Sequence, residues 1–316
     1  MSRRTLRWLR IPQYVAVGVD LSEEMVSVFL DLGGPAREVG RRTVVASLRP
    51  LTIGVMLETQ DAIQAATRGS CHLRFVTPDN QVLGVIYLTF TRRIDLGIQQ
   101  FTLFTVAGSE NRCIPTIVRP FQDLYERWRT HRHQKANPFN FQMEHRDLKA
   151  LFVFYLRPRP VYLVSVQHGA HLNIFPMDLV GPLDSAWFSF ALRLTSPAVD
   201  LMKHSGRFVA SGIDATFKTI AYELGRQHRQ LSIELPALPF ETCPSPEFGL
   251  PAPVAALDVR EVSVEHAMEV GSHCLFLTTV TRRSRSAETN GSRQLCHIHG
   301  SFAEALSDAG RSVLRA

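Results

Sequence analysis

Short runs of apolar and β-branched residues recur along the whole chain, and they limit the fold more than any other feature of the sequence. In the first half these runs span residues 42–48, 72–76, 82–91 and 100–106, and Pro78-Asp79-Asn80 supplies a hairpin turn between two of them. Runs of this length, bounded by turn residues, are typical of β-strands. We therefore expect a β-rich N-terminal half, closed by a helix near residues 121–129.

Strand-like runs continue in the second half, where they alternate with two helical segments. Ser196 can cap a helix that has Pro197 in its first turn and ends before Gly206, and residues 214–224 form a second helical pattern stopped by Gly225. The strand-like runs span residues 161–166, 186–192, 207–211, 257–264, 273–281 and 294–298. Strands with two flanking helices predict a mainly β (α+β) fold built around a small barrel.

The clearest change of character lies between Tyr125 and Arg146, where a helical pattern gives way to a polar, basic stretch broken by Asn137-Pro138. At 316 residues the chain is long enough for two domains. We place them at residues 1–140 and 141–316, and one domain carrying a long insertion is the alternative. No internal repeat is obvious in the sequence.

Charge and cysteine content restrict the partners and the location. The formal net charge of +6 favours anionic partners such as nucleotides and phosphorylated cofactors. Nucleic acid is disfavoured, because zinc-finger spacing, an RNP-type motif and a continuous basic helix face are all absent from the sequence. Five cysteines without C-x-x-C spacing predict a reducing compartment, so the cytoplasm is the expected location. No apolar run approaches the length of a membrane span.

One short segment has the chemistry of a phosphate site. Arg193-Leu194-Thr195-Ser196-Pro197 places a guanidinium and two hydroxyls at the start of a predicted helix. A helix N-terminus offers free backbone N–H groups and the positive end of the helix dipole, which together favour an anion. The alternative is that Ser196 only caps the helix and Arg193 only faces solvent.

A second segment could hold a flat aromatic ring. Residues 172–179, with the sequence LNIFPMDL, follow a predicted strand and a glycine turn. They mix apolar side chains with Asn173, Asp178 and backbone amides, as a ring with a polar edge requires. The alternative is an apolar loop that covers one end of the barrel.

The order of these features resembles the flavin reductase-like family, whose members have an FMN-binding split β-barrel. The family pattern runs from a proline and an apolar strand through a glycine turn to asparagine, then to another strand, a polar segment before a helix, and S-G-x-F-x-x-S. The corresponding segments here are Pro160 with residues 161–166, Gly169 to Asn173, residues 187–192, Arg193 to Pro197, and Ser205-Gly206-Arg207-Phe208-Val209-Ala210-Ser211. Further on, Gly271-Ser272-His273 resembles the family's G-D-H motif.

This resemblance covers the C-terminal half, and it implies both a cofactor and the residues that hold it. The ring and ribityl chain of FMN would lie along Asn173, Ile174, Phe175, Pro176, Met177 and Asp178. The phosphate would be held by Arg193, Thr195, Ser196 and Ser211. FMN is preferred to FAD by family habit, NADH or NADPH would donate hydride to the flavin, and the family is typically homodimeric.

The sequence departs from the family pattern at two places that bear on function. Ser272 stands where the family commonly has aspartate, and His297 and His299 stand where tyrosine or other residues are often found. We predict that His299 or His297 lies near the face where a nicotinamide or another substrate stacks on the flavin. The N-terminal half, which the usual single-domain reductase lacks, could recruit a protein partner.

Three other interpretations stay open. The first is a non-catalytic flavin-binding module used for sensing or for protein interaction, and the second is nucleic-acid binding through the basic linker. The third is a metal site built from His297 and His299 or from His131 and His133, with Cys296 or Cys274 as a further ligand, but two ligands do not make a site. We therefore predict no metal, and a flavin-dependent oxidoreductase is our first hypothesis.

Overall fold

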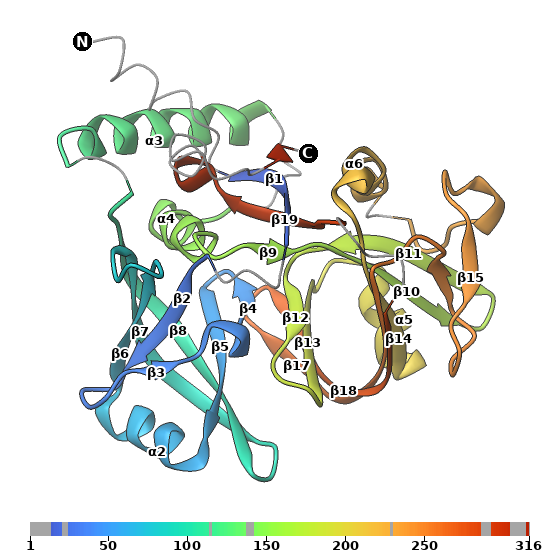
Figure 1. Ribbon diagram of the computed structural model, residues 1–316, viewed down its shortest axis with the longest axis horizontal. Helices are drawn as coiled ribbons and strands as arrows, with labels where there is room; N and C mark the ends of the chain where they lie inside the picture. Colours follow the sequence, from blue (N-terminus) through green and yellow to red (C-terminus); the bar gives the residue numbers. More distant parts are fainter. Residues whose placement is uncertain are drawn as a thin grey trace.

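The computed structural model describes residues 14–20, 25–113, 116–136, 142–227, 230–285, 292–303 and 314–315. The predicted breaker Asn137-Pro138 lies outside these residues. The described chain is mainly β, as predicted, with two large antiparallel sheets, a four-stranded sheet and a two-stranded sheet (Figure 1). No described helix is long and apolar enough to cross a membrane.

The N-terminal half forms a seven-stranded sheet with the order β3-β2-β6-β7-β8-β5-β4. Its elements are β2 (Ser27–Asp31), β3 (Arg37–Glu38), β4 (Thr43–Leu48), β5 (Leu51–Glu58), α2 (Thr59–Arg68), β6 (Ser70–Val76), β7 (Val82–Asp95) and β8 (Gln99–Asn111). The 3-10 turn η1 (Gly40–Arg42) precedes β4. The predicted β-rich N-terminal half is therefore confirmed.

The C-terminal half forms a second seven-stranded sheet with the order β11-β10-β14-β17-β18-β13-β12. Its elements are β10 (Tyr162–His168), β11 (His171–Met177), β12 (Val180–Pro182), β13 (Trp187–Arg193), α5 (Ala198–Ser205), β14 (Arg207–Gly212), β17 (Asp258–Val270) and β18 (His273–Arg285). Gly206 ends α5 in the left-handed conformation, as predicted, because a residue without a Cβ adopts a φ of 63° at little cost. Ser196 does not cap α5, since the N-cap is Pro197 and no side-chain cap hydrogen bond forms.

The remaining strands form two smaller sheets. Strand β1 (Tyr14–Val19) pairs with β19 (Gln294–His299), which also pairs with β9 (Arg159–Pro160), and β20 (Leu314–Arg315) pairs with β1. Between β14 and β17 lie η2 (Ala215–Phe217), α6 (Lys218–Arg226), η3 (Leu235–Ala237) and the pair β15 (Thr242–Pro244) and β16 (Pro251–Pro253). The second predicted helix therefore continues past Gly225 instead of stopping there.

The two halves pack closely against each other. Helix α3 (Arg119–Ala136) extends the predicted closing helix through the basic stretch, which is therefore helical up to Ala136. Helix α4 (His145–Phe154) lies beyond the predicted boundary yet packs on β7 and β8, and β4 packs on β12, β13 and β18. One apolar cluster contains core residues of both halves, among them Phe104 and Leu277. The boundary near residue 140 stays a prediction.

Candidate functional site

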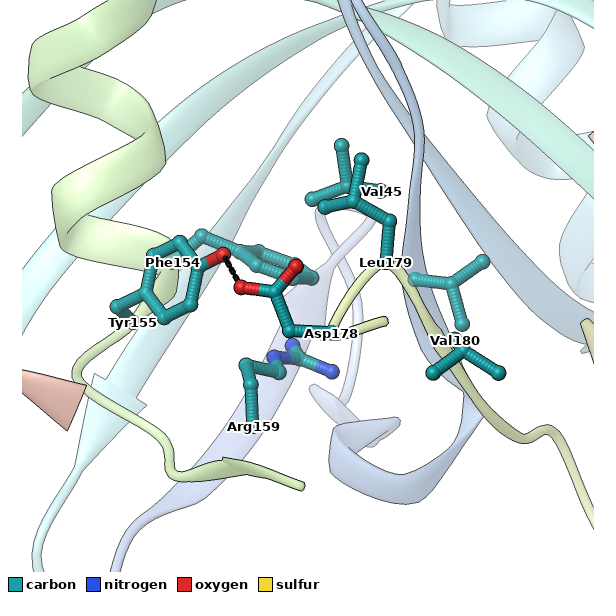
Figure 2. A pocket seen from close by; sticks show the side chains of 8 residues that line it. Val45, Phe154, Tyr155, Arg159, Asp178, Leu179 and Val180 are labelled. Carbon is teal, nitrogen blue, oxygen red and sulfur yellow. Dashed lines mark hydrogen bonds between the residues drawn. The ribbon is translucent and has the colours of Figure 1, made fainter. Parts of the chain in front are cut away.

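Asp178, directly after β11, is the centre of a polar network at the junction of the two halves. Its Oδ2 accepts a hydrogen bond of 2.5 Å from the Tyr155 hydroxyl and lies 2.8 Å from Nδ1 of His297 (Figure 2 shows the Tyr155 contact). Burial raises the pKa of Asp178, but the hydrogen bonds from His297 and Tyr155 outweigh it, so this pKa lies below its usual value. Asp178 is therefore ionised at neutral pH and fixes the orientation of both partners.

His297 extends this network towards the surface. It lies in β19, and its Nε2 is 3.1 Å from the hydroxyl of Tyr222 on α6. Because ionised Asp178 can only accept, Nδ1 of His297 carries a proton, and Nε2 is the ring atom that faces the hydroxyl of Tyr222. Tyr222 is 41% exposed. The four residues thus form a chain of hydrogen bonds from buried Tyr155 to the solvent, which we call the relay.

His299 lies two residues further along β19 but has different surroundings. It is buried, with Phe152 packed edge-on against its ring. Its Nδ1 accepts the backbone N–H of Ser301, and Nδ2 of Asn111 lies 2.9 Å from its Nε2. Burial lowers the pKa of His299 from 6.5 to about 4, so the ring is neutral in the folded protein. Of the two predicted catalytic histidines, only His297 contacts Asp178.

The buried His299 ring makes stability depend on pH. In the folded chain its pKa is about 4, whereas the unfolded chain binds the proton below its ordinary value of 6.5. The contribution of neutral His299 to the free energy of unfolding is therefore complete above pH 6.5. It is lost as the pH falls towards 4, by about 1.4 kcal/mol per pH unit. Urea unfolding at pH 7 and pH 5 measures it, and His299→Asn should remove about 2 kcal/mol of the pH dependence. An identical pH dependence in variant and wild type would contradict the burial.

Arg193 and His273 form a second part of the site, on adjacent strands. Arg193 is the last residue of β13 and pairs in register with His273, the first residue of β18. Burial lowers the pKa of Arg193, and the charge of Asp178 raises it. The N–H of Ala191 donates to the carbonyl of Leu179 at 3.0 Å, which holds the strand of Arg193 beside the segment that carries Asp178. Burial, and then the charge of Arg193, lower the pKa of His273 to about 4. We call Arg193, His273 and the following Thr195 and Ser196 the anion corner.

The anion corner joins a tight turn to the start of α5. The backbone N–H of Ser196 donates to the carbonyl of Arg193 at 2.8 Å, which folds the chain back before the helix begins. Thr195 is exposed and Ser196 is half-buried. A partly desolvated guanidinium beside two hydroxyls and a helix N-terminus is a suitable environment for a phosphate.

The other predicted cofactor residues have structural partners. Asn173 is buried and its Nδ2 donates to the carbonyls of Gln230 and Leu231, so it fastens that loop to β11. Ile174 and Phe175 pack into different core clusters because they point to opposite faces of β11. Pro176 and Met177 are half-buried at the end of β11, next to Asp178.

Ser211 is buried near the end of β14, where it pairs with Leu163 and Val259. Its hydroxyl has no hydrogen-bond partner within the described chain. No contact recorded among the described residues joins it to the anion corner. Of the predicted set, the structure therefore joins Asp178 and His297 by a hydrogen bond and places Arg193 on the strand beside the segment of Asp178, and it leaves Asn173 and Ser211 apart from them.

A small cavity lies between the relay and the N-terminal half. Its lining is shared by β4, which contributes Val44 and Val45, and by the segment around Asp178 (Figure 2). Arg159 closes the cavity, donating to the carbonyl of Thr43 at 2.8 Å and stacking 3.7 Å over the ring of Phe154. The cavity measures about 10 Å³, which is room for one water molecule. A flavin ring could lie only outside it.

Four residues of this site were not predicted as site residues, namely Tyr155, Arg159, Tyr222 and His273. The first three come from the end of α4, from β9 and from α6, so only the fold brings them to Asp178, and His273 is brought to Arg193 by the pairing of β13 with β18. No sequence pattern marks Tyr155 as a functional residue, because it continues an apolar helical pattern. Among the described residues, no group of three or more metal-ligating side chains comes together.

Fold and site together describe a mainly β protein with a hydrogen-bond network around Asp178 and a partly buried arginine, Arg193, in its C-terminal half. Residues 154–305 match the family model described as "Flavin reductase like domain", which confirms the resemblance for this half of the chain. Residues 154–305 are therefore similar to a flavin reductase like domain. The comparison with curated protein sequences found no match.

Solved structures similar to this chain include three flavin proteins. An FMN-binding protein from Thermus thermophilus has a TM-score of 0.40 and 19% identity, over 47% of this chain and 86% of its own. An NADH:FAD oxidoreductase from Streptomyces globisporus has a TM-score of 0.42 and 17% identity, over 52% and 95%. The flavin reductase component of a bacterial two-component tryptophan halogenase has a TM-score of 0.41 and 17% identity, over 48% and 94%.

Proposed function

We propose that the chain is an FMN-dependent oxidoreductase that transfers hydride between NADH or NADPH, or another substrate, and a flavin bound by the C-terminal half. The observation that carries this proposal is the position of Arg193. It lies in the flavin reductase like domain, partly buried, and the hydrogen bond from the N–H of Ala191 to the carbonyl of Leu179 keeps its strand beside the segment that carries Asp178. This arrangement supports a phosphate site next to a proton-transfer network, as a phosphorylated redox cofactor requires.

In this proposal the anion corner holds the phosphate of FMN. Arg193 supplies the charge, and Thr195 and Ser196 supply hydroxyl donors at the start of α5. Pro176, Met177 and Asp178 offer an apolar wall with one charged edge, which suits the ring. Bound FMN would supply the hydride-accepting ring.

We assign to the relay the transfer of the proton that accompanies substrate reduction or oxidation. Asp178 holds Nδ1–H of His297, so Nε2 can exchange a proton with Tyr222 or with a substrate that displaces it. We assign this role to His297 rather than His299, because His299 is only 4% exposed. His299 would position β19 through its bonds to Asn111 and Ser301.

A flavin-binding module without turnover is the second candidate. The observation in its favour is that the cavity beside Asp178, at about 10 Å³, is too small to hold a nicotinamide. This candidate predicts a bound flavin that neither NADH nor NADPH reduces.

The phosphate assignment is tested by comparing FMN with riboflavin, which has the same ring and no phosphate. Wild type should bind FMN more tightly, and Arg193→Ala should weaken FMN binding about 10- to 100-fold through loss of a charge-assisted hydrogen bond. Riboflavin binding should change little. Fluorescence titration of both flavins gives the two dissociation constants.

Arg282→Ala is a suitable control, because Arg282 is an exposed arginine of the same half, paired with Glu247. It should leave both dissociation constants unchanged. Equal weakening of FMN and riboflavin by Arg193→Ala would show that Arg193 does not bind the phosphate.

A further inference from the structure

The two large sheets have the same strand order. The sequence β3-β2-β6-β7-β8-β5-β4 corresponds, position by position, to β11-β10-β14-β17-β18-β13-β12. In each half a helix follows the strand next to the edge, α2 after β5 and α5 after β13, and each helix ends at a left-handed glycine, Gly69 or Gly206. The helices themselves have diverged, since α5 packs mainly on β10 whereas α2 packs on β5 to β8.

The strand registers also agree. Strand β8 runs from residue 99 to 111 and β18 from 273 to 285, so an offset of 174 superposes them. The same offset relates the two irregularities of each hairpin, which lie at Tyr87/Leu88 and Phe90/Arg92 in the first and at Glu261/Val262 and Val264/His266 in the second. Bulges are local features that unrelated hairpins have no reason to share at the same positions.

A trace of sequence identity remains at this offset. The identical pairs are Leu83 and Leu257, Val85 and Val259, Gly97 and Gly271, Leu103 and Leu277, Thr105 and Thr279, and Val106 and Val280. Both glycines have a positive φ, 87° at Gly97 and 53° at Gly271, in the turn between the paired strands. The N-terminal half is therefore a second copy of the sheet that carries the anion corner.

The two copies differ in charge at the position of the anion corner. In the second copy Arg193 pairs with His273, and the equivalent pair in the first copy is Glu58 with Gln99. The arginines nearby are paired with carboxylates, Arg37 with Asp61 at 3.1 Å and Arg42 with Glu58 at 3.5 Å. A carboxylate in place of a guanidinium repels a phosphate, so the described residues at the equivalent corner of the first copy do not suit an anion.

The N-terminal copy instead supports the anion corner of the C-terminal copy. Its β4–β5 hairpin lies on the turn before β18, where the N–H of Ser272 donates to the carbonyl of Arg49 at 2.9 Å. The N–H of Leu48 is 3.5 Å from Nδ1 of His273. A Cβ on Gly271 would lie 2.4 Å from the Arg49 carbonyl oxygen, so the hairpin leaves no space for a side chain there.

We infer that this chain contains two fused copies of the same sheet unit. The first copy supports the single flavin site, which lies in the second copy. A single chain then forms the complete site and binds one FMN. This inference rests on the proposed function for the identity of the ligand. It differs from the homodimer that the family resemblance implies.

Native mass spectrometry of the full chain with FMN, over a dilution series, tests the stoichiometry. We expect one chain with one FMN at every concentration. Two FMN per chain, or FMN found only on a species of two chains, would overturn the inference.

The hairpin contact is tested by a matched pair of glycine variants. Gly271→Ala introduces a clash with Arg49, whereas Gly97→Ala has the same kind of positive φ and no atom within 4 Å of its Cβ. We expect Gly271→Ala to weaken FMN binding about tenfold or more and Gly97→Ala to leave it unchanged, because a shift of the hairpin displaces His273 beside Arg193. Equal FMN affinities for the two variants would overturn the inference.

If wild type binds no FMN, the proposed function fails and the supporting contact is still measurable. Thermal unfolding should then show a lower midpoint for Gly271→Ala than for Gly97→Ala, since only the first carries a clash. Equal unfolding midpoints would show that the β4–β5 hairpin does not support the turn at Gly271.

Discussion

Replacement of Asp178 with asparagine is expected to lower turnover with NADH or NADPH about 100-fold while FMN stays bound. The carboxylate of Asp178 accepts from both Tyr155 and His297, and its negative charge holds the proton on Nδ1 of His297. A neutral amide keeps the shape but does not favour that tautomer, so Nε2 is no longer held ready to exchange a proton. Loss of a positioned acid or base typically costs 10²- to 10⁴-fold in rate.

Anaerobic stopped-flow kinetics on the FMN-loaded variant measures this effect separately from binding. Asp200→Asn is the matched control, because Asp200 is exposed in the first turn of α5 and should leave the rate unchanged. Wild-type turnover by Asp178→Asn, with flavin bound, would remove the relay from the mechanism.

Replacement of Arg159 with alanine is expected to lower the free energy of unfolding by about 3–5 kcal/mol. Arg159 follows α4 and donates to both oxygens of Thr43, at 2.8 and 3.3 Å, across the junction of the halves. Its guanidinium also covers the ring of Phe154. The variant loses this packing and two charge-assisted hydrogen bonds, each contributing about 1.5–3 kcal/mol.

Urea unfolding monitored by circular dichroism gives the value directly. Arg282→Ala again serves as the control, since its surface ion pair with Glu247 should contribute less than about 1 kcal/mol. Equal losses for the two variants would show that Arg159 does not tie the halves together.

Sequence patterns gave most of the second sheet, because its strands are short, apolar and bounded by turn residues, and because Gly206 marks the end of α5. Three residues of the anion corner, Arg193, Thr195 and Ser196, could be grouped from the sequence because they are nearly adjacent in the chain, whereas His273 reaches Arg193 only through the pairing of β13 with β18. The relay was only half predictable. Asp178 and His297 are 119 positions apart, and nothing in the local sequence says that β11 and β19 bring them within 2.8 Å.

The repeated sheet escaped the sequence interpretation for a physical reason. The offset between the copies is 137 residues at the pair Ser70 and Arg207, the first residues of β6 and β14, but 174 residues at Gln99 and His273. The difference reflects the elements η2, α6, η3, β15 and β16, which stand between β14 and β17 in the second copy alone. No single offset aligns the halves, and few identities remain, because a β-sheet core requires apolar residues at alternate positions and not particular ones.

The most direct test of the oxidoreductase assignment is the absorbance spectrum of the FMN-loaded full chain, recorded anaerobically before and after addition of NADH and then NADPH. The proposed function predicts a flavin spectrum that at least one nucleotide bleaches. A bound flavin that neither nucleotide bleaches would contradict nicotinamide-dependent hydride transfer, and failure to retain any flavin would contradict the flavin site itself.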